Sequence, residues 1–112
     1  MKDLNISLKQ LRYYLVASKH ESLRQAAREL KISQPSLSAQ LQKLEQALGI
    51  ELFERSRGGV RLTPLGRDLL KQAQQAVNAA EVIIDAANFA TKGPSGTFRL
   101  GASPTLGPYA LP

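Results

Sequence analysis

The most constraining feature of the chain is a pair of apolar stripes with helical spacing, on two expected helices that only residues 31–33 separate. The stripes consist of Leu23, Ala26, Ala27 and Leu30, and of Leu37, Leu41, Leu44 and Leu48. Apolar residues at intervals of three and four mark one face of an amphipathic helix. Two such helices joined by so short a turn are typical of a helix-turn-helix, so the sequence predicts that motif over residues 23–48.

Residues with capping chemistry stand at the expected helix ends. Ser22 is a candidate N-cap, and Gln25 three residues later completes a capping-box pattern. Ser33 is a candidate N-cap for the second helix, and Pro35 fits its first turn because a missing N–H is no loss there. Gly49 is a natural C-terminal stop. These signals place the two helices on either side of residues 31–33.

A third helix is expected before the motif. An apolar series with helical spacing begins at Leu8 behind Ser7, a candidate N-cap, and predicts a helix roughly to Ser18. The polar break that follows contains His20, the chain's single histidine, which we expect to lie at the surface.

The segment after the motif predicts a two-stranded hairpin. Leu52 and Phe53 look buried and lead into residues 54–62, where Gly58 and Gly59 supply the positive φ values that a tight turn demands. Three arginines lie at or near the tip. Together with the three helices, this hairpin makes a mainly α, winged helix-turn-helix domain, which we place at residues 6–63.

Residues 64–92 predict one long helix that serves dimerisation. Thr63 and Pro64 are a candidate N-cap and first helical residue. Gly66 is the one residue before residue 93 that would weaken the helix. About 28 residues at ~1.5 Å each give roughly 42 Å, longer than the small domain before it. Seven-residue spacing favours pairing with a second copy, and packing on the chain's own domain is the alternative. The expected dimer face consists of Leu69, Leu70, Ala73, Ala76, Val77, Ala80, Ile83, Ile84 and Ala87.

Residues 93–112 predict a hinge, a short strand at 97–101 and a loop. A lone short strand is not a stable unit. We therefore expect this stretch to open a second domain that continues beyond the sequence.

The net charge of +6 is concentrated in the first part of the chain. Residues 1–66 hold 11 Lys and Arg against 6 Asp and Glu, whereas residues 67–112 hold 4 against 3. Such an excess favours a polyanion such as nucleic acid, although charge that only aids solubility gives the same count. The sequence has no cysteine, which excludes disulfides and thiolate chemistry. It shows no signal peptide and no apolar span, so we expect a cytoplasmic protein without a membrane partner.

The helix over residues 34–48 carries side chains suited to a DNA major groove. Glutamine can bond an adenine edge through both amide atoms, and serine is a small donor or acceptor. Helix N-termini attract phosphate, and hairpin arginines suit phosphates or a minor groove. The expected DNA contacts are Ser22, Arg24, Ser33, Gln34, Pro35, Ser36, Ser38, Gln40, Lys43, Arg55, Arg57 and Arg61. Each of these residues, taken alone, could instead be an ordinary capping or solvated residue. The prediction of DNA binding therefore depends on the order and spacing of the helices, the hairpin and the long helix.

Seven segments together resemble the LysR-type transcriptional regulators. They are Leu11–Tyr14, Ala26-Ala27, Ser33–Ser38, Leu44-Glu45, Leu48-Gly49, Leu52–Arg55 and Leu62–Gly66, and the match covers essentially the whole chain. The resemblance implies the domain order above, followed by a periplasmic-binding-protein-like domain that senses a small molecule or redox signal. It also implies dimers, and tetramers at full length.

The resemblance further implies roles for particular residues. Gln34, Pro35, Ser36 and Ser38 would lie on base edges or phosphates, and Arg55 would serve the wing. In residues 93–112, Ser103 and Thr105 match positions that often line the effector site of the family.

Three rival functions remain open at this level. An enzyme is disfavoured because His20 has no nucleophile motif, phosphate loop or metal cluster beside it. A protein-interaction module would use the long helix as its binding surface, and an architectural protein would bind DNA without sequence preference. Salt would weaken DNA binding steeply but not an apolar helix interface. We predict a sequence-specific regulator, without a cofactor in these residues, that binds a partly palindromic operator as a dimer.

Overall fold

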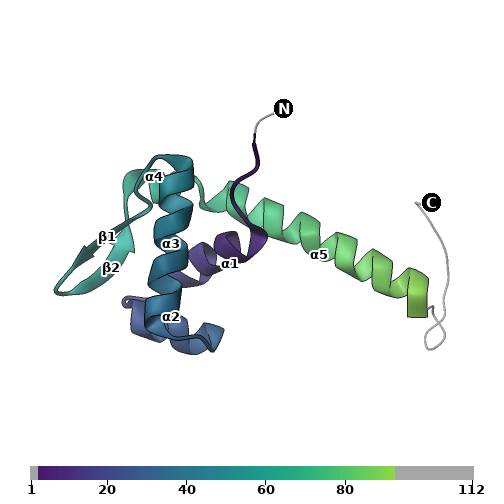
Figure 1. The fold of residues 1–112 in the computed structure, drawn as a ribbon, viewed down its shortest axis with the longest axis horizontal. Helices are drawn as coiled ribbons and strands as arrows, with labels where there is room; N and C mark the ends of the chain where they lie inside the picture. Colours follow the sequence, from purple (N-terminus) through teal and green to yellow (C-terminus); the bar gives the residue numbers. More distant parts are fainter. Residues whose placement is uncertain (1–2, 93–112) are drawn as a thin grey trace. The chain divides into compact units, whose positions relative to one another are not determined.

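The computed structural model describes residues 3–92, which form helices and one hairpin (Figure 1). The elements are α1 Leu8–Ala17, α2 Leu23–Leu30, α3 Gln34–Leu48, β1 Phe53–Ser56, β2 Gly59–Leu62, α4 Pro64–Asp68 and α5 Leu70–Lys92. The chain divides between Asn78 and Ala79 into two units. The predicted hinge and strand, with Ser103 and Thr105, lie outside the described residues.

The first unit is built around one core in which α1, α2 and α3 pack against one another in pairs. Its largest fully buried side chains are Tyr14, Leu37, Leu41, Leu44 and Leu52. Ala26 and Ala27 are 0% and 3% exposed, because their small side chains let the helices approach closely. The predicted helix-turn-helix is therefore confirmed in α2 and α3.

The turn of this motif depends on Lys31, which has a φ of +59°. A left-handed residue at the end of α2 reverses the chain sharply, and the Ile32 N–H then donates to the Ala27 carbonyl at 3.0 Å. Ile32 is half-buried against the core. Ser33 caps α3 by accepting from the Ser36 N–H at 3.2 Å, as predicted.

The complete capping box lies on α1 and not on α2. Ser22 accepts from the Gln25 N–H at 3.2 Å, but within residues 3–92 the side chain of Gln25 returns no bond to it. At α1, Ser7 accepts from the Gln10 N–H, and the Ser7 N–H donates to Gln10 Oε1, each at 3.0 Å. The prediction at Ser22 was thus half right.

The hairpin is antiparallel, and its turn consists of Arg57 and Gly58. The register pairs Phe53 with Leu62, Glu54 with Arg61, Arg55 with Val60, and Ser56 with Gly59. Gly59 has the positive φ that the sequence predicted, at +124°, but Gly58 does not. A Cβ on Gly59 would lie 2.1 Å from the Glu21 carbonyl oxygen. The neighbouring Val60 N–H donates to that oxygen at 2.9 Å, so the hairpin is anchored on the turn between α1 and α2.

A carboxylate of α3 holds the base of the hairpin. Glu45 Oε2 accepts from the Leu52 N–H at 2.7 Å and from the Phe53 N–H at 3.1 Å. The Phe53 ring meets the Tyr14 ring edge to face, with centroids 5.9 Å apart at 84°. The hairpin and the helices therefore form one structural unit.

The single helix predicted from residue 64 is in fact two helices. α4 ends at Asp68, and Leu69 has a φ of −93° and a ψ of −2° before α5 begins. The buried Tyr14 hydroxyl donates to the Gly66 carbonyl, a group that an unbroken helix would pair with the Leu70 N–H. This side-chain partner explains the break.

Gly66, which the sequence marked as a weak point of the helix, is required by the packing of α4. It is buried, and a Cβ there would lie 2.1 Å from the Leu52 carbonyl oxygen. The absence of a side chain is therefore what lets α4 contact the segment that leads into β1.

The first turns of α5 pack on the core of their own unit. Ala73 and Val77 are 5% and 6% exposed, and Leu70 and the preceding Leu69 are half-buried against the same core. Ala73 and Val77 are therefore covered by their own chain, which revises the expected dimer face at these two positions. Beyond Asn78 the large apolar side chains are exposed to solvent. The exposed fractions are 66% for Val82, 69% for Ile83, 57% for Ile84 and 45% for Phe89.

Candidate nucleic-acid interface

The outward face of α3 forms the centre of the candidate interface. Because Leu37, Leu41 and Leu44 are fully buried, the opposite side of the helix faces solvent. The exposed residues along its first three turns are Gln34, Pro35, Ser36, Ala39, Gln42 and Lys43. Gln34 and Lys43 make no side-chain hydrogen bond to residues 3–92 and are open to a ligand.

The serines of the first turn bond to each other. The Ser33 hydroxyl accepts from the Ser36 N–H and donates to the Ser36 hydroxyl at 2.8 Å. Ser33 is thereby committed to capping, whereas the exposed Ser36 hydroxyl can still donate. The exposed start of α3 also presents backbone N–H groups and the positive end of the helix dipole, which suit a phosphate.

Two further α3 residues are bonded to other elements. Ser38 accepts from Arg55 Nη1 of β1 at 3.4 Å, which links the hairpin to α3. Gln40 Oε1 accepts from Gln10 Nε2 of α1 at 3.2 Å. Sequence reasoning missed Gln10, although Ser7 and Gln10 have the spacing of a capping box and would have drawn attention to it.

The three hairpin arginines are exposed but differ in their contacts. Arg61 Nε lies 3.5 Å from Glu54 Oε1, and the two side chains are 85% and 56% exposed, so this pair is weak. Arg57 lies in the turn and forms no ion pair within residues 3–92. Arg57 is therefore the hairpin cation most available to a phosphate.

The start of α2 provides a second edge of the candidate interface. Ser22 is half-buried as its N-cap, and Arg24 is exposed in its first turn. A cation beside free backbone N–H groups suits a phosphate contact.

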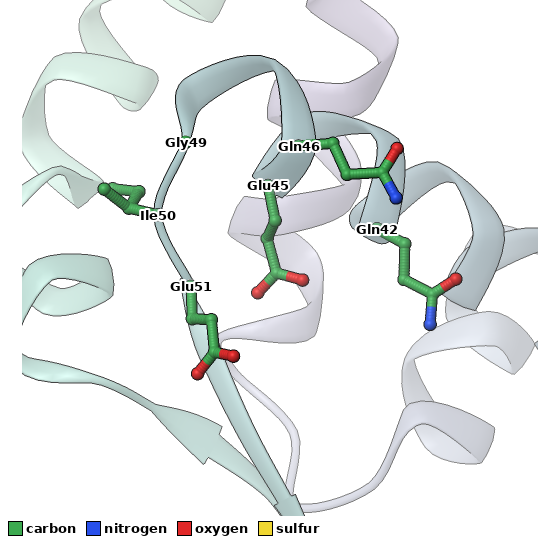
Figure 2. A pocket seen from close by; sticks show the side chains of 6 residues that line it. All are labelled: Gln42, Glu45, Gln46, Gly49, Ile50 and Glu51. Carbon is green, nitrogen blue, oxygen red and sulfur yellow. The ribbon is translucent and has the colours of Figure 1, made fainter.

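The C-terminal end of α3 has the opposite character. A hollow of about 530 Å³ is lined by Gln42, Glu45, Gln46, Gly49, Ile50 and Glu51, and Figure 2 shows the two carboxylates beside it. A neighbouring hollow shares both carboxylates and adds Phe53, Glu54 and Arg55. Negative charge disfavours phosphate here, so the candidate interface comprises the first turns of α3, the start of α2 and the hairpin tip, and leaves out this end of α3.

The described residues offer little catalytic chemistry. His20 is partly buried, with Nε2 2.7 Å from Glu29 Oε1, and within residues 3–92 neither side chain hydrogen-bonds to a nucleophile. That part of the chain contains no group of three His, Cys, Asp or Glu side chains placed to hold a metal ion. None of its helices has the length and apolar content to cross a membrane.

The fold and this surface define a winged helix-turn-helix protein. The family description "bacterial regulatory helix-turn-helix protein, lysR family" matches residues 8–67, which is more than half of the sequence. The chain therefore belongs to the LysR family of transcription regulators, whose members are not enzymes, and the resemblance noted from the sequence is confirmed.

Relatives support this assignment along nearly the whole chain. The hydrogen peroxide-inducible genes activator of Dickeya chrysanthemi is 36% identical over 107 residues, 96% of this chain and 35% of the relative. Oxidized OxyR of Corynebacterium glutamicum is similar over 81% of this chain and 28% of that chain, at 40% identity and a TM-score of 0.75. The CbnR_DBD–DNA complex matches 77% of this chain and 99% of that chain, at 32% identity and a TM-score of 0.71. The chain thus spans about a third of the length of the curated relatives.

Proposed function

We propose that residues 6–63 bind double-stranded DNA in a sequence-specific manner, with α3 in the major groove and the hairpin against the flanking backbone. The observation that carries the proposal is the exposed polar face of α3 beside an arginine-bearing hairpin in one structural unit. Solved DNA complexes of the relatives CbnR and BenM support it.

The contacts divide into base reading and backbone positioning. Gln34 and Pro35 lie on the exposed start of α3, where an amide and an apolar ring suit base edges. Lys43, Arg24 and the hairpin arginines suit phosphates. Ser22 and Ser33 act through the backbone N–H groups that their caps orient, and Ser36 and Ser38 supply hydroxyl groups.

Pairing of two copies through residues 64–92 is the second part of the proposal. Val82, Ile83 and Ile84 are each more than half exposed, and an apolar helical face of this kind is stabilised by a second copy. The candidates that remain of the predicted face are Leu69, Leu70, Ala76, Ala80, Ile83, Ile84 and Ala87. A two-fold dimer would require two related half-sites, and hence a partly palindromic operator.

The proposal extends to the whole protein by analogy with its family. We infer a periplasmic-binding-protein-like effector domain that begins in residues 93–112, with Ser103 and Thr105 at its ligand site. The effector would be a small molecule or a redox signal, and the full-length protein would be a homotetramer. A bacterial regulator that binds DNA would act in the cytoplasm.

Matched variants on the two surfaces of α3 test the DNA contact. Gln34→Ala should weaken binding to the preferred duplex about 5- to 100-fold and relax the preference at one base pair. Gln46→Ala removes the same side chain beside the acidic hollow and should leave affinity unchanged. Fluorescence anisotropy with the preferred duplex and single-base variants measures both effects. Equal losses in the two variants would contradict the proposed orientation of α3.

A further inference from the structure

The side chain of Gln40 is held by a chain of hydrogen bonds that begins at a backbone group. The Ser7 N–H donates to Gln10 Oε1 at 3.0 Å, and Gln10 Nε2 donates to Gln40 Oε1 at 3.2 Å. A backbone N–H can only donate, so the Gln10 atom facing Ser7 must be its oxygen. The Gln10 atom that faces Gln40 is then the amide nitrogen of Gln10, so the Gln40 atom that accepts this hydrogen bond must be an oxygen.

These hydrogen bonds determine which end of the Gln40 amide is available to a ligand. Gln40 Oε1 is turned toward α1 and already accepts one bond. Its NH₂ group makes no hydrogen bond to residues 3–92 and has two donor hydrogens. Gln40 therefore presents a donor, whereas reading an adenine edge with both amide atoms would also require the oxygen.

The position of Gln40 on α3 indicates where this donor points. Gln40 is half-buried and directly precedes the fully buried Leu41, so it lies at the border of the exposed face. Ser36 and Lys43, four residues before and three after it, are exposed on the same side of the helix. A hydroxyl, an amide N–H and an ammonium thus form a row of donors, which matches the acceptor oxygens of a DNA backbone.

We propose that Gln10 is a positioning residue that fixes the Gln40 amide as a donor to one DNA phosphate oxygen. The proposal rests on the proposed function, since it concerns the same surface, but it makes a separate claim. In this proposal Gln40 contacts the DNA backbone, so it positions the protein on DNA and carries no sequence information. Helix α1 contributes to the interface through Gln10, although it touches no base.

A double-mutant cycle on the isolated chain tests the coupling. Gln10→Glu keeps an oxygen for the Ser7 N–H, so the capping box and the melting temperature should be unchanged. It removes the donor to Gln40, so Gln40 must turn its NH₂ group toward Glu and its oxygen toward DNA. We expect Gln10→Glu to weaken duplex binding about 10-fold in the parent, consistent with one lost hydrogen bond. In the Gln40→Ala background the same change should cost less than about 3-fold, which measures the added charge alone.

A scan of single methylphosphonate groups in the duplex identifies the acceptor. At one phosphate, the neutral substitution should weaken binding of the parent but not of Gln40→Ala. Equal costs of Gln10→Glu in both backgrounds, or a Gln40 effect that follows a base pair and not a phosphate, would overturn the inference. Both results require a parent that binds DNA, so failure of the parent to bind any duplex would reject the proposed function instead.

Discussion

The buried hydroxyl of Tyr14 gives the fold a measurable dependence on alkaline pH. Tyr14 is 1% exposed, and its hydroxyl donates to the Gly66 carbonyl between α1 and α4. Burial raises the pKa of Tyr14 from 10.0 to about 12, because the phenolate would be poorly solvated there. The folded state therefore holds this proton more tightly than the unfolded chain.

The sign and size of the effect follow from that difference. Below about pH 10 both states keep the proton, so the full free energy of unfolding is present. Between about pH 10 and 12 the unfolded chain loses its proton first, and unfolding becomes easier. A raise of two units corresponds to roughly 3 kcal/mol, of which about 1.4 kcal/mol should be lost by pH 11.

Urea unfolding followed by circular dichroism at neutral pH and near pH 11 measures this effect. Tyr14→Phe should cost about 1 to 3 kcal/mol at neutral pH, since the Gly66 carbonyl loses its partner, and should lack the extra alkaline decline. Tyr13→Phe changes the neighbouring, half-buried tyrosine and should keep the decline of the parent. The same alkaline decline in the parent and Tyr14→Phe would refute the assigned role of this hydroxyl.

Three other perturbations test separate parts of the structure. Gly66→Ala should destabilise the fold by more than about 3 kcal/mol, because its Cβ would meet the Leu52 carbonyl. Gly49→Ala, which has open space around its Cβ but a φ of +75°, should cost only about 1 kcal/mol. Thermal unfolding of the two variants compares these costs, and equal costs would contradict the packing at α4. Ile83→Glu should yield a monomer at micromolar concentration in analytical ultracentrifugation, and a persistent dimer would place the interface elsewhere. Arg57→Ala should weaken all duplexes similarly and reduce the salt slope by about one, so an unchanged slope would remove the hairpin turn from the interface.

The sequence predicted those parts of the fold that depend on local chemistry. Ser22 and Ser33 are the N-caps of α2 and α3, and Gly49 is the C-cap of α3, as expected. Capping could be predicted because it needs only neighbouring backbone groups. The burial of Leu52 and Phe53 was also predicted correctly. These signals lie within a few residues of the structure they specify.

Features that depend on distant contacts were predicted less well. The break at Leu69 follows from the Tyr14 hydroxyl, 52 residues from Gly66 in the chain, and no local pattern shows that contact. Seven-residue spacing likewise could not separate Ala73 and Val77, which the chain buries itself, from the exposed Ile83. Of the candidate site, Gln34 and Lys43 were identified by residue type, but the bond from Gln10 to Gln40 requires the packing of α1 on α3.

The central claim is that this chain reads DNA sequence as a pair of copies. Selection of bound duplexes from a random pool at two salt concentrations, followed by sequencing, tests it most directly. We predict recovery of a partly palindromic motif at both concentrations, with total retention falling steeply as salt rises. Recovery of duplexes without any shared motif, or retention that does not depend on salt, would contradict the account.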